Sequence, residues 1–168
     1  MTPSGGPQVA LGVTGCIAAY KACEVLRCLQ KAGADVEVVM TAAAAEFVGP
    51  QTFAALSGHP VGMGLFGEQG DPIPHIRLGQ GCDGFLIAPC TADVLAKLAA
   101  GIADDLLTSA ALACPAPIIV APAMNAHMYG NAATQANIAT LKSRGIHVLD
   151  PDSGHLACGD TGPGRLPE

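Results

Sequence analysis

Three residues of this sequence, His75, Asn125 and Cys158, have side chains suited to proton transfer and carboxylate binding. A histidine can take or give a proton near neutral pH, and a thiol in a glycine-rich segment could be delivered to a site as a proton donor. An asparagine can donate to a carboxylate without adding a charge that opposes its loss as carbon dioxide. Taken singly, each also has an ordinary interpretation, as a surface histidine, a turn asparagine or an inert thiol.

A short glycine-containing turn, Gly12-Val13-Thr14-Gly15-Cys16-Ile17, closes the first apolar run of the chain. Small residues and free backbone N–H groups at the start of a helix suit a phosphate group. The turn is not a G-x-G-x-x-G motif, so a mononucleotide phosphate fits it better than NAD. A tight turn without any ligand remains an alternative, and Thr41, after the second run, is either a helix cap or a second hydroxyl for that phosphate.

The hydrophobic periodicity predicts the elements that must position these residues. Apolar runs alternate with stretches of helical spacing, which predicts an α/β fold: a doubly wound, Rossmann-like parallel sheet with helices on both faces. Glycine- and proline-rich segments at 58–74 and 150–168 break the alternation and are expected to be mobile loops, the second covering a substrate. The predicted strands are 8–13, 35–40, 84–88, 117–120 and 146–149, and the predicted helices are 17–32, 41–48, 91–99, 104–113 and 132–144.

The ends of the third and fourth predicted strands carry further candidate site residues. In an open parallel sheet, ligands bind beyond the carboxyl ends of the strands. The segment 88–91 places a proline and small residues there, which could form a flat shelf for a planar ring, and Thr91 and Asp93 could cap the next helix. The segment 122–125 brings Asn125 to the same rim.

Composition limits the classes of function. The net charge of −6 is spread along 168 residues without a basic stripe, which argues against a nucleic-acid partner. Seven cysteines without C-x-x-C or metal-site spacing predict reduced thiols, a cytoplasmic location and no metal. The absence of a signal segment and of any long apolar run predicts no membrane association. A half-hydrophobic chain of one domain, 1–168, with only 13% charged residues is expected to self-associate.

Taken in order, several motifs resemble the family of homo-oligomeric flavin-containing cysteine decarboxylases over essentially the whole chain. Their joint presence is more specific than any one of them. Within that family, the tail motif is similar to that of phosphopantothenoylcysteine decarboxylases. The motifs are Gly12-Val13-Thr14-Gly15, His75-Ile76-x-Leu78, Ala88-Pro89-x-Thr91-Ala92, 101–107, Pro122-Ala123-Met124-Asn125-x-x-Met128 and Ala157-Cys158-Gly159-Asp160-x-Gly162-x-Gly164-Arg165.

The resemblance implies a flavodoxin-like FMN enzyme of coenzyme A biosynthesis. The implied reaction oxidises the cysteine moiety of 4′-phosphopantothenoylcysteine to a thioaldehyde, releases carbon dioxide and re-reduces the enethiol to 4′-phosphopantetheine. Asn125 is implied to hold the carboxylate, His75 to act as a base or to orient the substrate, and Cys158 to donate a proton. The family further implies a homotrimer or a dodecamer of trimers, with His75 contributed by the neighbouring subunit, and a synthetase domain fused to or associated with the chain.

The resemblance also assigns binding residues. Besides Asn125, the substrate is expected to contact Met128, Ala157 and Arg165. The residues expected to bind FMN are Gly12, Thr14, Gly15, Cys16, Ile17, Thr41, Phe47, Ala88, Pro89, Cys90, Thr91, Asp104, Thr108, Ala123 and Met124.

Three residues depart from the family pattern: Asp93 stands where asparagine is common, Tyr129 where tryptophan is frequent, and Cys16 where serine or glycine is usual. These departures bear on flavin contacts and affinity more than on the fold or the reaction. Three other functions remain open: a peptidyl-cysteine decarboxylase that releases an enethiol, an enzyme that prenylates the flavin, and a non-catalytic flavoprotein subunit that regulates a partner.

Overall fold

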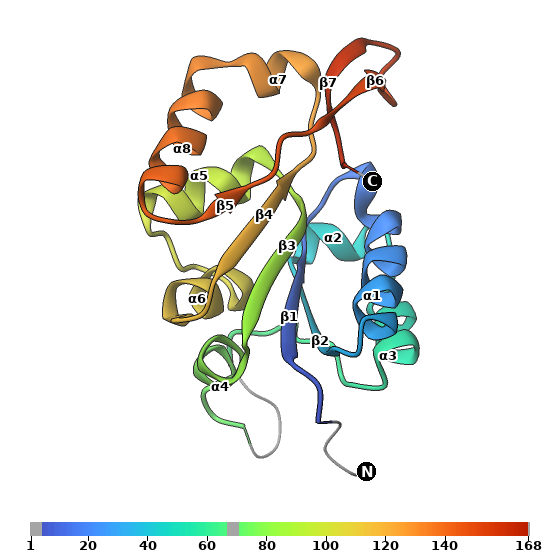
Figure 1. Ribbon diagram of the computed structural model, residues 1–168, viewed down its shortest axis with the longest axis vertical. Coiled ribbons are helices and arrows are strands. Elements are labelled where there is room, and N and C mark those ends of the chain that lie inside the picture. The colour runs from blue at the N-terminus through green and yellow to red at the C-terminus, as the bar shows by residue number, and fades with distance from the viewer. Residues whose placement is uncertain (1–4, 67–70, 168) are drawn as a thin grey trace.

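A five-stranded parallel sheet forms the centre of the molecule (Figure 1). The computed structural model describes residues 5–66 and 71–167, so residues 1–4, 67–70 and 168 of the expected 1–168 domain lie outside it. The sheet order β2-β1-β3-β4-β5 confirms the doubly wound, flavodoxin-like prediction. The strands are β1 (Gln8–Val13), β2 (Asp35–Met40), β3 (Gly84–Cys90), β4 (Ile118–Pro122) and β5 (His147–Val148).

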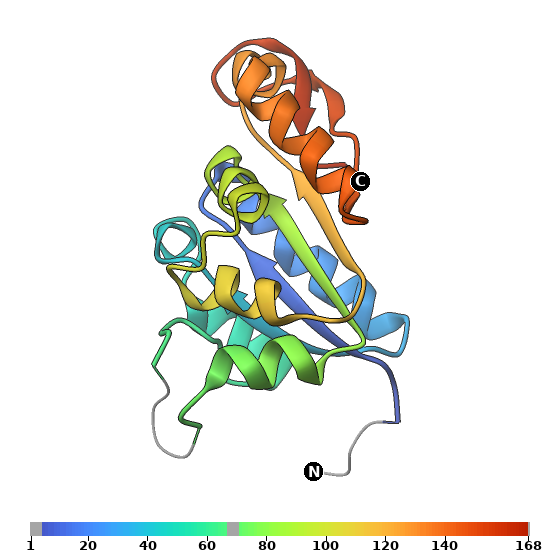
Figure 2. The same cartoon turned by 90° about the vertical axis from the view of Figure 1, so that its left-hand side faces the viewer.

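Helices cover both faces of the sheet, as Figures 1 and 2 show. Helices α1 and α3 pack on one face with Leu26 and Phe53, whereas α4, α5, α6 and α8 cover the other with Leu78, Leu95 and Leu107. Both faces of the strands are therefore buried, which explains their nearly continuous apolar sequences. The helices are η1 (Ile17–Lys21, a 3₁₀ turn continuous with α1), α1 (Ala22–Lys31), α2 (Ala42–Ala45), α3 (Pro50–Ser57), α4 (Pro74–Gly81), α5 (Ala92–Ala100), α6 (Leu106–Ala113), α7 (Ala126–Gly130) and α8 (Ala132–Ser143).

The glycine-rich tail is an antiparallel hairpin, so the prediction of a loop over 150–168 was wrong. Strands β6 (Asp152–His155) and β7 (Thr161–Arg165) pair with each other. The backbone N–H of Met124 donates to the carbonyl of Gly164 at 3.0 Å, and Leu156 and Leu166 are buried. Glycine and proline can pair in a short edge hairpin when flanking apolar side chains are buried, and here they attach it beside the end of β4.

The segment 58–74 is also more ordered than the sequence predicts. Gly62 pairs with the edge strand β2, since its N–H donates to Val38 and its carbonyl accepts from Met40, each at 2.9 Å. This part of the segment is therefore fixed to the sheet, while 67–70 lie outside the described residues. Within 5–66 and 71–167, no helix combines the length and apolar character needed to cross a bilayer.

Candidate functional site

A cavity of about 540 Å³ opens at the carboxyl ends of β1, β3 and β4, beneath the β6–β7 hairpin. Its size falls within the range of small-molecule sites, and its position is where a doubly wound sheet binds ligands. The lining residues are Gly15, Cys16, Ile17, Ala18, Tyr20, Lys21, Thr91, Ala92, Asp93, Ala123, Met124, Asn125, Met128, Leu156, Ala157, Cys158, Gly164, Arg165 and Leu166.

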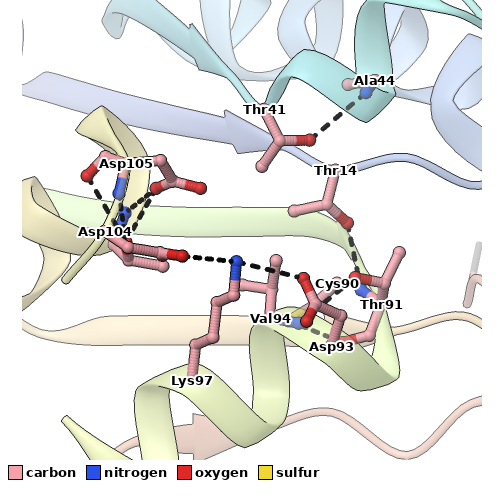
Figure 3. Close-up of polar contacts among 11 residues, drawn as sticks. Thr14, Thr41, Ala44, Cys90, Thr91, Asp93, Val94, Lys97, Asp104 and Asp105 are labelled. Carbon is pink, nitrogen blue, oxygen red and sulfur yellow. Dashed lines mark hydrogen bonds and ion pairs between the residues drawn. The ribbon is translucent and has the colours of Figure 1, made fainter. Parts of the chain in front are cut away.

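The hydroxyl of Thr14 joins the ends of β1 and β3 beneath this cavity (Figure 3). It donates to the carbonyl of Pro89 at 2.7 Å and accepts from the N–H of Thr91 at 3.0 Å. Thr14 is fully buried, so both bonds are shielded from water. The resemblance assigns Thr14 to flavin binding, which stays a prediction; in this structure its hydroxyl fixes the two strand ends.

The turn after β1 has room only for glycine at position 15. A Cβ added there would lie 2.4 Å from the Cβ of Ala43, so the turn sits directly against α2. The turn then enters η1, whose first N–H groups have no partner within the helix and can face an anion. Burial raises the pKa of the Cys16 thiol, which keeps it neutral. Ile17 and Tyr20, each 59% exposed, leave apolar surface on the rim.

The first turn of α5 supplies a charged edge to the cavity. The hydroxyl of Thr91 caps the helix by accepting from the N–H of Val94 at 3.3 Å. The Lys97 ammonium lies 3.4 Å from Asp93 and 3.2 Å from Asp104 (Figure 3). Burial lowers the pKa of Lys97, but the hydrogen bond that its ammonium donates to Asp104 and the charge of Asp93 outweigh this effect and raise the pKa overall. Lys97 therefore partly balances the charge that Asp93 brings to the site.

Asn125 and Cys158 meet at the opposite edge. The Asn125 Oδ1 accepts from the N–H of His127 at 2.8 Å and caps α7, so its Nδ2 faces the hairpin. That Nδ2 lies 3.1 Å from the Cys158 Sγ and 2.8 Å from the Asp160 Oδ2. The Cys158 thiol also donates to this oxygen at 3.4 Å. Hydrogen bonds from Asn125 and Cys158 lower the pKa of the Asp160 carboxyl below its ordinary value.

The structure brings all four predicted substrate residues and part of the predicted flavin set to this cavity. Thr108 is buried in the capping box of α6, where it bonds to Asp105, and Asp104 pairs with Lys97. Thr41 caps α2. The residues that line the cavity are Gly15, Cys16, Ile17, Thr91, Ala123, Met124, Asn125, Met128, Ala157, Cys158 and Arg165; those that do not are Gly12, Thr14, Thr41, Phe47, Ala88, Pro89, Cys90, Asp104, Thr108 and His75.

His75 belongs to a different part of the chain. It lies in the first turn of α4, a helix at the end of the sheet opposite the hairpin (Figure 1). Its Nδ1 is buried and has no hydrogen-bond partner among the described residues. Within one chain, therefore, the histidine is not placed beside Asn125 and Cys158.

Sequence reasoning missed several lining residues and Asp160. Tyr20 and Lys21 lie one turn beyond the glycine turn, so helical spacing could have indicated them. Asp160 follows Cys158 by two residues, but only the hairpin turn shows that both side chains face Asn125. Leu156, Gly164 and Leu166 give no chemical signal in the sequence, because they contribute apolar surface and backbone only.

Comparisons with known proteins give a consistent result. The Flavoprotein family matches residues 2–168. The chain is 48% identical to the coenzyme A biosynthesis bifunctional protein CoaBC of Vibrio vulnificus over 100% of the chain and 42% of that protein. The corresponding protein of Escherichia coli K12 is 49% identical over 96% of this chain and 40% of its own length. That of Mycolicibacterium smegmatis is 51% identical over 98% of this chain and 40% of its own length. The chain thus spans about two fifths of the length of these relatives.

Solved structures agree with the fold. A cysteine-to-serine mutant of PPC decarboxylase complexed with pantothenoylaminoethenethiol matches with a TM-score of 0.85 and 32% identity, over 97% of this chain and 92% of that one. The FMN-dependent cysteine decarboxylase SpaF matches with a TM-score of 0.85 and 32% identity over 96% and 90%. The FMN-binding protein AtHal3 matches with a TM-score of 0.81 and 33% identity, over 96% of this chain and 90% of that one.

Proposed function

The chain belongs to the Flavoprotein family, and we propose that it is an FMN-dependent phosphopantothenoylcysteine decarboxylase acting in coenzyme A biosynthesis. The observation that carries the proposal is the contact of Asn125 with Cys158, whose Nδ2 and Sγ atoms lie 3.1 Å apart at the edge of an apolar cavity. A neutral donor and a thiol together suit the binding of a carboxylate and the later return of a proton.

The cavity fits a flavin mononucleotide. Gly15 and Cys16 form a small-residue turn that leads into η1 at Ile17, and the start of this helix suits the phosphate. Thr91 and Met124, on the ends of two neighbouring strands, form a wall for the planar ring. When bound, FMN supplies a hydride acceptor and later a hydride donor for the thiol-bearing carbon of the substrate.

The chain's own groups then orient the substrate and move protons. Asn125 Nδ2 holds the substrate carboxylate without a positive charge, so the departure of carbon dioxide is not opposed by loss of an ion pair. The Cys158 thiol donates a proton to the carbon that has lost the carboxylate. Cys158 lies in the turn of the hairpin, which brings its thiol to the edge of the cavity beside Asn125.

We also propose that the active enzyme is a homo-oligomer built from trimers. His75 lies away from the cavity of its own chain, and its buried Nδ1 has no partner among the described residues. Exposed apolar side chains such as Ile17 and Tyr20 border the cavity. A neighbouring subunit that covers this rim and supplies its own His75 explains both observations.

Two further proposals follow from the relatives and the cysteines. Because the chain matches about two fifths of bifunctional relatives, we infer that a phosphopantothenoylcysteine synthetase domain accompanies it. All seven cysteines are free thiols, which supports a reducing, cytoplasmic location.

The test is to incubate phosphopantothenoylcysteine with the purified, flavin-loaded protein and to follow its conversion by mass spectrometry. The expected product has lost carbon dioxide and retains a saturated thiol. A Cys158→Ser variant is expected to accumulate a species two hydrogens lighter than this product, because the final protonation fails. A flavin-loaded protein that leaves this substrate unchanged contradicts the proposal.

A further inference from the structure

Asp160 makes contacts at the candidate site that the proposed mechanism does not use. Its Oδ2 accepts from Asn125 Nδ2 at 2.8 Å and from the Cys158 thiol at 3.4 Å. The orientation of the Asn125 amide is set independently, because its Oδ1 caps α7 through His127. Nδ2 is therefore the group available to an anion, and in this state the anion is a carboxylate from the chain itself.

We propose that Asp160 is a positioning residue whose carboxylate occupies Asn125 Nδ2 in place of the substrate carboxylate and is displaced when substrate binds. The inference rests on the proposed function, in which Asn125 receives the substrate carboxylate. Two carboxylates near one amide donor repel each other, so they alternate there instead of binding together.

The exchange links the chemistry to the hairpin. Asp160 lies in the turn between β6 and β7, and the backbone N–H of Leu156 donates to its carbonyl at 2.8 Å. Displacing its side chain frees the Cys158 thiol from the Asp160 Oδ2, so the thiol can turn toward the substrate. After Cys158 has donated its proton and the product has left, Asp160 returns to Asn125 and the original arrangement is restored.

The test compares the affinities of two unreactive ligands for the flavin-loaded protein by calorimetry. One is the substrate analogue in which serine replaces cysteine; the other is its decarboxylated ethanolamine counterpart, which lacks the competing carboxylate. The variant Asp160→Asn keeps the side-chain shape but removes the charge. The matched control is Asp150→Asn, which also removes one negative charge but at a residue that does not line the cavity. Asp150 precedes the hairpin and pairs with Lys142.

Asp160→Asn is expected to bind the serine analogue about three- to tenfold more tightly than the wild type, because a weaker neutral competitor replaces the carboxylate. Affinity for the ethanolamine analogue should change less than about twofold, and Asp150→Asn should bind both analogues as the wild type does. Unchanged or weaker binding of the serine analogue, or equal tightening of both, rejects the exchange.

Turnover of phosphopantothenoylcysteine by the same wild-type preparation separates the two ideas. An active wild type combined with unchanged affinities of Asp160→Asn rejects the exchange alone. An inactive wild type that binds neither analogue rejects the proposed function, and the exchange with it.

Discussion

The substitution Thr14→Val tests whether one buried hydroxyl holds the floor of the cavity. Valine has nearly the same shape as threonine, so the change removes the hydrogen bonds but little packing. The carbonyl of Pro89 then loses its 2.7 Å donor and the N–H of Thr91 its 3.0 Å acceptor. Pro89 lies where the pairing of β3 with β4 shifts register, between residues 87 and 90, so no regular ladder bond replaces the lost one.

The expected loss of stability follows from these two groups. A buried polar group left without a partner costs about 1–3 kcal/mol, and the partly exposed N–H of Thr91 falls at the lower end, which gives about 2–4 kcal/mol in total. With a urea m-value of about 2 kcal/mol/M, the unfolding midpoint drops by about 1–2 M. Flavin-stripped protein at one fixed protein concentration should be used, because ligand binding and self-association both shift the midpoint.

Two variants serve as controls. Thr41→Val makes the same chemical change at a hydroxyl that only caps α2, through a 3.2 Å bond from the N–H of Ala44, and should cost about 1 kcal/mol. Thr14→Ser keeps the hydroxyl and loses one methyl group, about 1 kcal/mol. Thr14→Val should also weaken FMN binding, since Gly15 and Thr91 flank the two strand ends that it releases. A Thr14→Val midpoint no lower than that of Thr41→Val refutes the reasoning.

Two substitutions and one measurement on the unchanged protein have further expected outcomes. Gly15→Ala should lose the bound-flavin absorbance, because its Cβ would lie 2.4 Å from α2, whereas Gly49→Ala, where an added Cβ meets nothing within 4 Å, should retain it. Asp105→Ala removes the α6 capping box and should lower Tm by about 2–8 °C in calorimetry, for a loss of about 1–2 kcal/mol. Burial and a thiol neighbour at 3.7 Å raise the pKa of Cys82 to about 11, so below that pH it is mostly protonated and should be alkylated by iodoacetamide at pH 8 far more slowly than exposed Cys28.

The sheet was predictable from the sequence because parallel strands buried on both faces give nearly continuous apolar runs. Helix α4 was not. Its sequence contains Gly79 and Gly81, which disfavour a helix. The structure shows why the glycine at 79 is accepted: an added Cβ would lie 2.3 Å from the carbonyl of Ala110, so α4 packs closely against α6 only without a side chain there. The contact with α6 therefore outweighs the low helix propensity of α4, and the local sequence of α4 gives no sign of that contact.

The candidate site was predictable in part. Residues at strand ends, such as Cys16 and Asn125, were found because topology alone brings strand ends together. Thr108 was assigned to flavin by resemblance, which stays a prediction; the pattern Asp105-x-x-Thr108 is also a helix-capping pattern, and the structure forms that cap. This local alternative was visible in the sequence.

The meeting of Asn125 with Cys158 depends on a residue that has no side chain. Gly164 has φ +142, and a Cβ on it would lie 2.1 Å from the carbonyl of Met124. This close approach lets the N–H of Met124 donate to the carbonyl of Gly164, which fixes β7 beside the residue that precedes Asn125. The other half of the hairpin then carries Cys158 to Asn125 across 33 residues of sequence. The sequence shows a glycine at 164, but the backbone against which it packs appears only once the chain has folded, so the pairing of the two chemical groups could not be read from their spacing.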